Sequence, residues 1–441
     1  MRDGARRPIP EVPLSTLSTQ HAPPAAPSQI RTVAWASAIG STIEWYDFFL
    51  YGTAAALVFD KQFFPALDPV VGTIAAFGTL AVGFGARILG GLIFGHFGDR
   101  IGRRTTLIVS LLVMGLATVG IGLLPNYDRI GVAAPLLLVL LRVVQGIGLG
   151  GEWGGAVVLT LEHAPDKRRG LWGSFPQLGT PAGLLLANGA FLACSTLLDR
   201  ADYLAWGWRI PFLLSVVLIG IGLYLRVHVQ ESPEFVERVR HDGPSRAPLR
   251  AVLVRHWRRV LLAAIILVGN SAVSYVFMVY MLSYGAKVQG LSKPFMLAAV
   301  IAGTLAWLIT SPLWALAGDR FGLRDIFVYG TATRIAWSLV FFPVVDTGNR
   351  PLIIGYMVVM GVIISMTYAP VGTLAAGFFP VDVRYSGASI AYQIASLLGG
   401  GITPLVAASI YAATGTSWSI TAYTCVISLL SLLASLAIPR E

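Results

Sequence analysis

The chain has 441 residues, of which 55% are hydrophobic and only 12% are charged. Soluble domains carry about 25% charged residues, so this composition excludes an ordinary water-soluble protein and indicates one that lies in a lipid bilayer. A net charge of +10 could indicate a nucleic-acid partner, but the placement of the basic residues points to membrane topology instead.

Residues 1–31 are rich in Pro, Ala, Ser and Arg and contain no apolar core, which predicts a disordered tail rather than a signal peptide. After this tail, apolar windows of about 20 residues recur, each long enough to cross a hydrocarbon core of about 30 Å as a helix. We therefore predict an all-α membrane protein with twelve transmembrane helices, at 33–58, 70–96, 103–124, 132–162, 169–197, 208–228, 259–286, 294–317, 325–345, 351–377, 383–412 and 416–438.

The Lys and Arg residues are distributed unevenly between the two sides of these predicted spans. Of 32 such residues, seven fall on one side and three inside spans, and the others lie on the side that includes the N-terminal tail and residues 226–259. The positive-inside rule then places both termini in the cytoplasm. We expect a multi-pass protein of a bacterial inner membrane, and the same distribution argues against nucleic-acid binding.

A charged motif between the second and third spans occurs a second time in the chain. Residues 95–104 (GHFGDRIGRR) match residues 315–324 (ALAGDRFGLR) at five of ten positions, at an offset of 220. Asp166, Arg168, Gln177 and Gly183 likewise recur at an offset of 216, as Asp382, Arg384, Gln393 and Gly399. A repeat this long predicts two related halves rather than a solenoid. We expect two pseudo-symmetric six-helix bundles, 32–228 and 258–438, joined by a cytoplasmic linker at 229–257.

Only three acidic residues, Glu44, Asp47 and Glu152, fall well inside a predicted span. A carboxylate at the bilayer centre costs at least about 2.5–3.5 kcal/mol, so each is a candidate functional group. Glu44 and Asp47 project from one helix face, with Tyr51 a turn further on. Repulsion and desolvation favour a proton on one of the two carboxyls, as a reversible proton carrier requires. The alternative is that Asp47 only caps or pins a neighbouring helix through a salt bridge.

Three arginines also lie inside predicted spans. Arg87 and Arg142 are the expected counter-ions of these carboxylates, since a guanidinium keeps its charge and binds a carboxylate in two places. The alternative is a static ion pair between helices. Arg334 has no acid at a similar depth, which predicts a peripheral or interfacial position for it.

The second half offers uncharged polar groups in place of acids, which suggests a division between ion coupling and ligand binding. Packing between helices is the more common role of any single Ser or Thr in a span. Our candidate substrate-binding residues are Tyr51, Gln145, Gln177, Asn270, Ser274, Tyr275, Tyr392 and Gln393.

The sequence lacks HExxH, GxxxxGK[ST] and paired CxxC motifs, and its two cysteines lie far apart. We therefore expect no enzyme, no metal and no cofactor, with a gradient as the energy source.

With these residues identified, the chain resembles the major facilitator superfamily, and within it the metabolite:proton symporter family. The superfamily's loop signature is present at 95–104, and its second copy departs from the pattern at Leu323. The more specific signals are 44–48 (EWYDF), 146–155 (GIGLGGEWGG) and 206–212 (WGWRIPF). Ser232-Pro233-Glu234 and the run from Arg384 extend the resemblance to nearly the whole chain. The shikimate transporter branch is the most similar, through residues 55–59 (AALVF) and 384–404.

This resemblance implies the major facilitator fold with a central cavity, and proton-driven uptake of a small organic acid or zwitterion by a monomer. It also implies a cytoplasmic gate that includes Asp99 and Arg103; our candidate gate residues are Gly95, Asp99, Arg100, Gly102, Arg103, Arg104, Asp319 and Arg320. Asn270 stands where the shikimate branch is expected to carry a glutamate, so the resemblance does not determine which substrate is transported. The alternatives are a proton-coupled exporter of a metabolite or drug, and a membrane sensor that binds without transporting.

Overall fold

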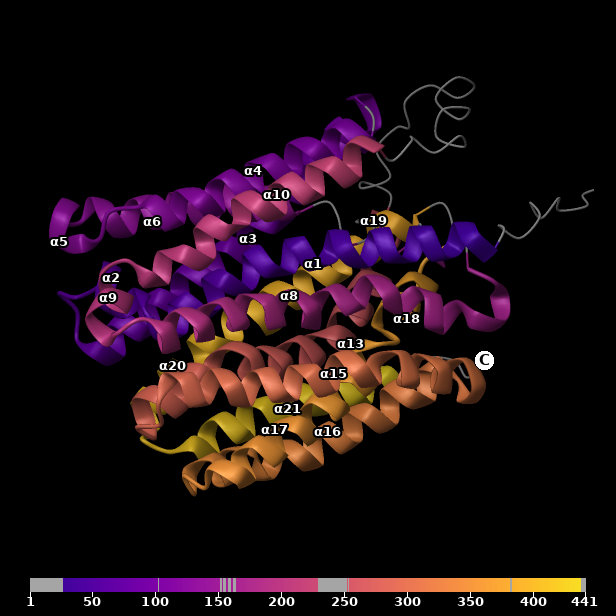
Figure 1. Ribbon diagram of the computed structural model, residues 1–441. Coiled ribbons are helices and arrows are strands. Elements are labelled where there is room, and N and C mark those ends of the chain that lie inside the picture. Colours follow the sequence, from indigo (N-terminus) through magenta and orange to yellow (C-terminus); the bar gives the residue numbers. More distant parts are fainter. Residues whose placement is uncertain are drawn as a thin grey trace, which may run out of the picture.

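The computed structural model describes residues 27–437 with gaps at 102, 151–152, 154–155, 158–159, 162–163, 229–251, 253 and 381–382. The regular elements in the described ranges are helices, and no strand occurs among them (Figure 1). The all-α prediction is confirmed.

The helices before the gap at 229–251 are α1 (Pro27–Leu57), α2 (Phe59–Phe63), α3 (Pro69–Ile101), α4 (Arg103–Leu123), α5 (Tyr127–Ile130), α6 (Ala133–Leu149), α8 (Arg169–Leu197), α9 (Arg200–Ala205) and α10 (Ile210–His228). The long ones lie roughly parallel in the upper part of Figure 1.

The helices after the gap are α13 (Trp257–Tyr275), α14 (Met281–Ser283), α15 (Lys293–Phe321), α16 (Leu323–Asp346), α17 (Arg350–Tyr368), α18 (Val371–Gly377), α19 (Arg384–Ala395), α20 (Ile402–Thr414) and α21 (Ser417–Leu436). Turns of π-helix at Val276–Tyr280, Tyr284–Val288 and Ser396–Gly401 join some of them into longer spans.

Among the described residues, nine helices are long and apolar enough to cross a bilayer. Two shorter apolar helices, Ile108–Leu123 and Ala133–Leu149, match the third and fourth predicted spans. The first predicted span is α1, a 31-residue helix whose mean hydropathy is lowered by polar residues such as Glu44 and Asp47. The twelve-span architecture is therefore confirmed.

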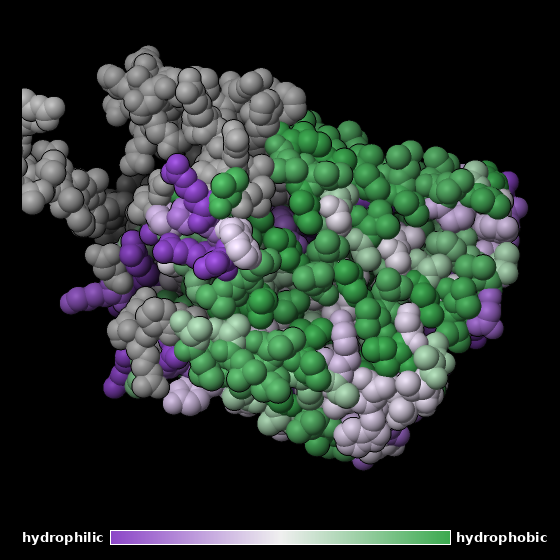
Figure 2. Space-filling view, turned by 180° about the vertical axis from the view of Figure 1, so that it is seen from behind, coloured by the Kyte–Doolittle hydropathy of each residue, from purple (hydrophilic) through white to green (hydrophobic). Residues whose placement is uncertain are grey.

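The outer surface is what a lipid environment requires. Large apolar side chains such as Leu116, Leu136 and Ile309 are about two-thirds exposed. Figure 2 shows hydrophobic residues across the middle of one face and hydrophilic residues toward its two ends. Such an apolar band matches the hydrocarbon core of a membrane.

Glycine contacts repeat between the two halves and confirm that these are related in structure. A Cβ added to Gly146 on α6 would collide with the carbonyl oxygen of Gly83 on α3. A Cβ added to Gly361 on α17 would collide with the carbonyl oxygen of Gly303 on α15. Small residues let membrane helices approach this closely, and the two contacts are related by offsets of 220 and 215 residues.

Candidate substrate and proton site

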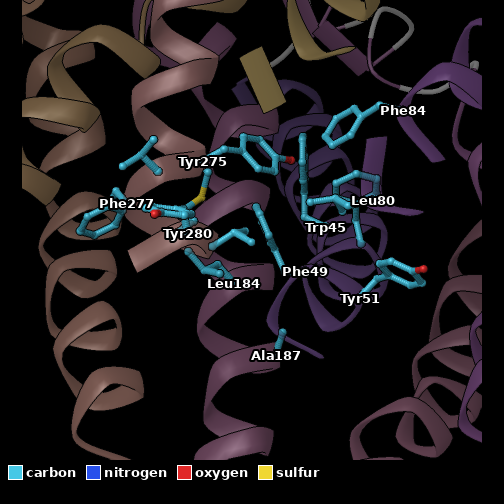
Figure 3. Packing of buried hydrophobic residues seen from close by; sticks show 14 of the residues in the cluster. Trp45, Phe49, Tyr51, Leu80, Phe84, Leu184, Ala187, Tyr275, Phe277 and Tyr280 are labelled. Atoms are coloured by element: carbon cyan, nitrogen blue, oxygen red, sulfur yellow. The ribbon is translucent and has the colours of Figure 1, made fainter. Parts of the chain in front are cut away.

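Aromatic side chains from both halves meet at the centre of the molecule. Phe84 on α3 contacts Tyr275 at the end of α13, with ring centroids 5.4 Å apart, and Phe49 on α1 lies 6.0 Å from the same ring. Figure 3 shows Tyr275 turned toward Trp45 and Phe84. The π-helical turn after Tyr275 also lies here, and such turns are frequent at functional sites.

Arg142 on α6 is completely buried beside this aromatic cluster. Its guanidinium carbon lies 4.4 Å from the ring centre of Phe48 and 4.1 Å from that of Tyr51, which are cation–π distances. Its Nη1 donates to Oε1 of Gln145 at 2.5 Å, whereas Nε and Nη2 have no hydrogen-bond partner in the described part of the chain. Arg142 therefore has two buried donor atoms available to a ligand.

Arg87 on α3 lies at the same junction and is 2% exposed. Its guanidinium carbon is 5.5 Å from the ring centre of Trp45 and 5.4 Å from that of Phe48, and its Nε has no partner. Two buried guanidinium groups thus approach one aromatic cluster.

Asp47 on α1 is completely buried. Its Oδ1 accepts a hydrogen bond from the hydroxyl of Ser215 on α10 at 2.6 Å, and its Oδ2 has no hydrogen-bond partner within the described ranges. No described cation forms an ion pair with Asp47, so the predicted direct pairing with Arg87 or Arg142 does not occur in this conformation. A buried carboxylate without a cation is costly, so this setting suits a protonated carboxyl.

Gln145 connects the arginine to the aspartate through hydrogen bonds. Its Oε1 accepts from Arg142, and its Nε2 donates to the backbone oxygen of Asp47 at 3.3 Å and to Oγ1 of Thr118 at 2.7 Å. Both the oxygen and the nitrogen of this amide already form hydrogen bonds within the protein. In this conformation the structure therefore does not support the predicted direct contact of Gln145 with the substrate. The structure instead places Gln145 between the guanidinium of Arg142 and the backbone of Asp47.

The other two candidate proton carriers differ in what can be described. Glu44 on α1 is buried, with 7% exposure. Glu152 lies outside the described residues.

The remaining candidate residues near the centre link the two halves to each other. Gln393 donates to the carbonyl oxygen of Gly150 at 3.2 Å. Tyr392 stacks on Trp153 with ring centroids 3.7 Å apart, and the Trp153 indole N–H donates to Gln177 at 3.4 Å. Gln177 and the neighbouring residues Tyr392 and Gln393, from two predicted spans, are thus brought to one interface between the halves.

A second contact between the halves escaped prediction. The hydroxyl of Tyr368 on α17 lies 3.1 Å from that of Thr180 on α8 and 3.2 Å from that of Tyr392. Ser274 and Tyr275 are both buried, and their hydroxyl groups have no hydrogen-bond partner among the described residues. Their role in substrate binding stays a prediction.

The predicted position of Arg334 is wrong. Arg334 on α16 is completely buried, not peripheral, and its Nη1 donates to Oδ1 of Asn270 at 2.7 Å and to Oγ1 of Thr367 at 3.1 Å. The absence of a nearby acid in the sequence suggested exposure, but neutral oxygen atoms bind the guanidinium instead. Asn270 is therefore engaged inside the C-terminal half.

Among the gate candidates, Asp319 closes one end of the interface between the halves. Its Oδ1 accepts from the backbone N–H of Gly170 at 2.6 Å, and its Oδ2 from that of Leu171 at 2.9 Å. A carboxylate at the first turn of α8 satisfies free N–H groups and complements the helix dipole. Gly322, with φ of 97°, ends α15 just beyond it, which explains the motif's second glycine.

Arg320 is exposed, with its guanidinium carbon 5.2 Å from the ring centre of Phe321. The other gate candidates lie outside what the structure describes in detail. They are Gly95, Gly102 and the side chains of Asp99, Arg100, Arg103 and Arg104.

Sequence reasoning missed a set of contacts at the opposite end. Lys287 and Asp60 form an ion pair between the halves, with Nζ 2.9 Å from Oδ2, and Lys287 also donates to Thr73 at 3.0 Å. Lys293 donates to the backbone oxygen of Leu57 at 2.6 Å. The signal available in the sequence was that three of the four lysines of the chain lie on the side predicted to carry few basic residues.

Comparison with known proteins identifies the family. The model of the Major Facilitator Superfamily matches residues 37–404. The chain belongs to this superfamily. A relative, the inner membrane metabolite transport protein YhjE of Escherichia coli (strain K12), is 42% identical over 378 residues, which cover 85% of this chain and 86% of YhjE.

Other relatives have more specific names. The shikimate transporter of E. coli (strain K12) is 38% identical, with 89% of this chain and 90% of the transporter covered. The proline/betaine transporter of the same strain is 34% identical, with 86% and 77% covered.

Among solved structures, the xylose transporter XylE of E. coli in a partially occluded inward open conformation superposes with a TM-score of 0.72, at 19% identity, over 94% of this chain and 99% of XylE. This likeness supports the major facilitator fold. The family and the relatives confirm that the chain is a membrane transporter and not an enzyme.

Proposed function

We propose that this protein is a proton-coupled symporter that imports a small organic acid or zwitterionic metabolite by alternating access. The observation that carries the proposal is the pair Arg142 and Asp47, joined through Gln145 at the junction of the two halves. The shikimate and proline/betaine transporters among the relatives support a ligand that carries a carboxylate.

The substrate's carboxylate is expected to bind the unpartnered guanidinium nitrogens of Arg142 and Arg87. Such hydrogen bonds are charge-assisted and can be bidentate, so they discriminate carboxylates from neutral solutes. The hydroxyl groups of Ser274 and Tyr275 and the aromatic rings would contact the rest of the molecule. Tyr51 keeps Arg142 in place, because its hydroxyl bonds Thr79 at 2.5 Å while its ring faces the guanidinium.

Asp47 is the proposed site of proton binding. With its proton, the carboxyl can stay buried against the hydroxyl of Ser215, and the two halves can reorient around it. When the proton leaves, the carboxylate becomes a competitor for Arg142. Coupling arises because the protein then binds the proton and the substrate with different affinities in its inward-facing and outward-facing states.

In the proposed cycle, residues 32–228 and 258–438 are the two rocking bundles, connected by the linker at 229–257. The end that carries Asp319 faces the cytoplasm of a bacterium, together with both termini, and the end with Asp60 and Lys287 faces outward. The protein acts as a monomer, with the proton gradient in place of a cofactor.

The test is uptake into liposomes that contain the purified protein. Candidate ligands such as shikimate, proline, betaine and dicarboxylates are first screened for their ability to raise the melting temperature, because a ligand that binds the folded protein stabilises it. Uptake of the best ligand should become concentrative only when an inward proton gradient is imposed. Concentrative uptake that persists after the gradient is collapsed would exclude proton coupling.

A further inference from the structure

A positive charge without a counter-ion is buried inside the C-terminal half. Arg334 has no exposed surface, and none of the described carboxylates forms an ion pair with it. Asn270 and Thr367 accept hydrogen bonds from Nη1, whereas Nε and Nη2 have no hydrogen-bond partner among the residues that the structure describes. An isolated buried charge is strongly destabilising, so a compensating anion is expected beside it.

Further unpartnered donors lie close to this guanidinium. Ser338 is one turn beyond Arg334 on the same face of α16, and its buried hydroxyl has no partner. Ser428 on α21 is completely buried and is likewise without a partner.

Two contacts place Ser428 in the same region. The thiol of Cys425, one turn before it, lies 3.9 Å from the backbone oxygen of Ile335, next to Arg334. A Cβ added to Gly269, next to Asn270, would lie 2.9 Å from Cα of Ser428. Figure 1 shows α13, α16 and α21 within one bundle. Helices α16 and α21, packed beside α13, therefore carry buried N–H and O–H groups that have no hydrogen-bond partner among the described residues.

The repeat explains which group is missing. A Cβ on Gly183 would touch the backbone of Thr42 and Tyr46, and a Cβ on Gly399 would touch that of Val268 and Ala272, so positions of α1 and α13 correspond at an offset of 226. Asn270 therefore corresponds to Glu44. The N-terminal half has a carboxyl at this place, and the C-terminal half has a neutral amide.

We propose that the C-terminal half binds a small monovalent anion of the chloride class at Arg334, between α13, α16 and α21. One guanidinium supplies one positive charge, which matches a monovalent anion, and the hydroxyls of Ser338 and Ser428 supply further donors. The enclosure of all these groups excludes a metabolite-sized carboxylate. The residues of this site belong to the C-terminal half, whereas Arg142 and Asp47 belong to the N-terminal half.

The experiment measures the melting temperature of the purified protein in detergent while chloride replaces gluconate at constant ionic strength and pH. In the wild type, chloride should raise the melting temperature saturably, by at least ~2 °C. N270D builds a carboxylate next to the guanidinium, so this variant should lose the chloride-dependent increase. N349D is the matched control, because it adds the same charge at an exposed helix cap in the same half and should keep the increase.

Equal melting temperatures of the wild type in chloride and gluconate would overturn the proposal, as would an unchanged chloride response in N270D. If N270D does not fold, the shape of the wild-type titration decides. A hyperbolic response that bromide reproduces supports the site, and a response that is linear in concentration refutes it, because only specific binding saturates.

Discussion

Replacement of Lys287 by Met is expected to open the end of the molecule that this residue holds closed. Lys287 binds both Asp60 and Thr73 across the interface between the halves, and its side chain is 25% exposed against 7% for Asp60. An exposed ion pair contributes about 0–1 kcal/mol, whereas loss of one partner of a buried pair costs about 3–5 kcal/mol. The intermediate exposure indicates ~2 kcal/mol, which is a shift of about 30-fold toward the open state.

The assay is the rate of maleimide modification of a cysteine placed at Val279, in a background without Cys194 and Cys425. Val279 is buried against Gly52 of the other half, so modification requires the halves to separate. K287M should accelerate the reaction by about 30-fold.

D60N should accelerate this reaction less than K287M does, because Lys287 keeps its bond to Thr73. The exchanged pair D60K/K287D should restore part of the protection. K61M is the control, since Lys61 is exposed beside Asp60 and outside the ion pair. A rate in K287M within twofold of the background, or the same acceleration in K61M, would refute the reasoning.

D47N should abolish concentrative uptake and leave substrate exchange intact, because the amide imitates a permanently protonated carboxyl against Ser215. A proton driven by 100 mV supports about 50-fold accumulation of the substrate in the wild type. Unchanged accumulation in the variant would move the proton site to Glu44 or Glu152. R142K should raise KM at least ~10-fold, because an ammonium lacks the planar fork that stacks on the neighbouring rings; a KM equal to that of the wild type would remove Arg142 from the binding site. D319N should speed maleimide modification of a cysteine at Thr373 about threefold, because the interaction of the carboxylate with the α8 dipole is lost. An unaltered rate would show that the contact does not hold this end closed.

The sequence indicated which charged side chains lie inside the protein, but not which atoms they contact. Asp47 and Arg142 stood out as candidate residues because charged side chains are costly in the membrane, and the structure shows that both are buried. Their separation by Gln145 was not predictable, since helical periodicity does not determine how neighbouring helices are rotated about their axes. The π-helical turn at Ser396–Gly401 illustrates this limit, because it shifts the faces of the span beyond it by part of a turn.

Arg334 shows the complementary error. A missing acid was interpreted as exposure, although neutral oxygens from two other helices accept its hydrogen bonds. Contacts between residues far apart in sequence decide such cases. The ion pair of Lys287 with Asp60 was missed for the same reason, since it joins residues 227 positions apart across the two halves.

The glycine contacts that repeat between the two halves have a mechanical consequence. At Gly146 and at Gly361 the backbones of two helices touch directly, so there is no compressible side chain between them to absorb a displacement. A displacement at one end of a half is therefore transmitted along it with little internal deformation, so each half moves as a rigid body. Replacement of either glycine by alanine would push its two helices apart and would shift the packing along the length of that half.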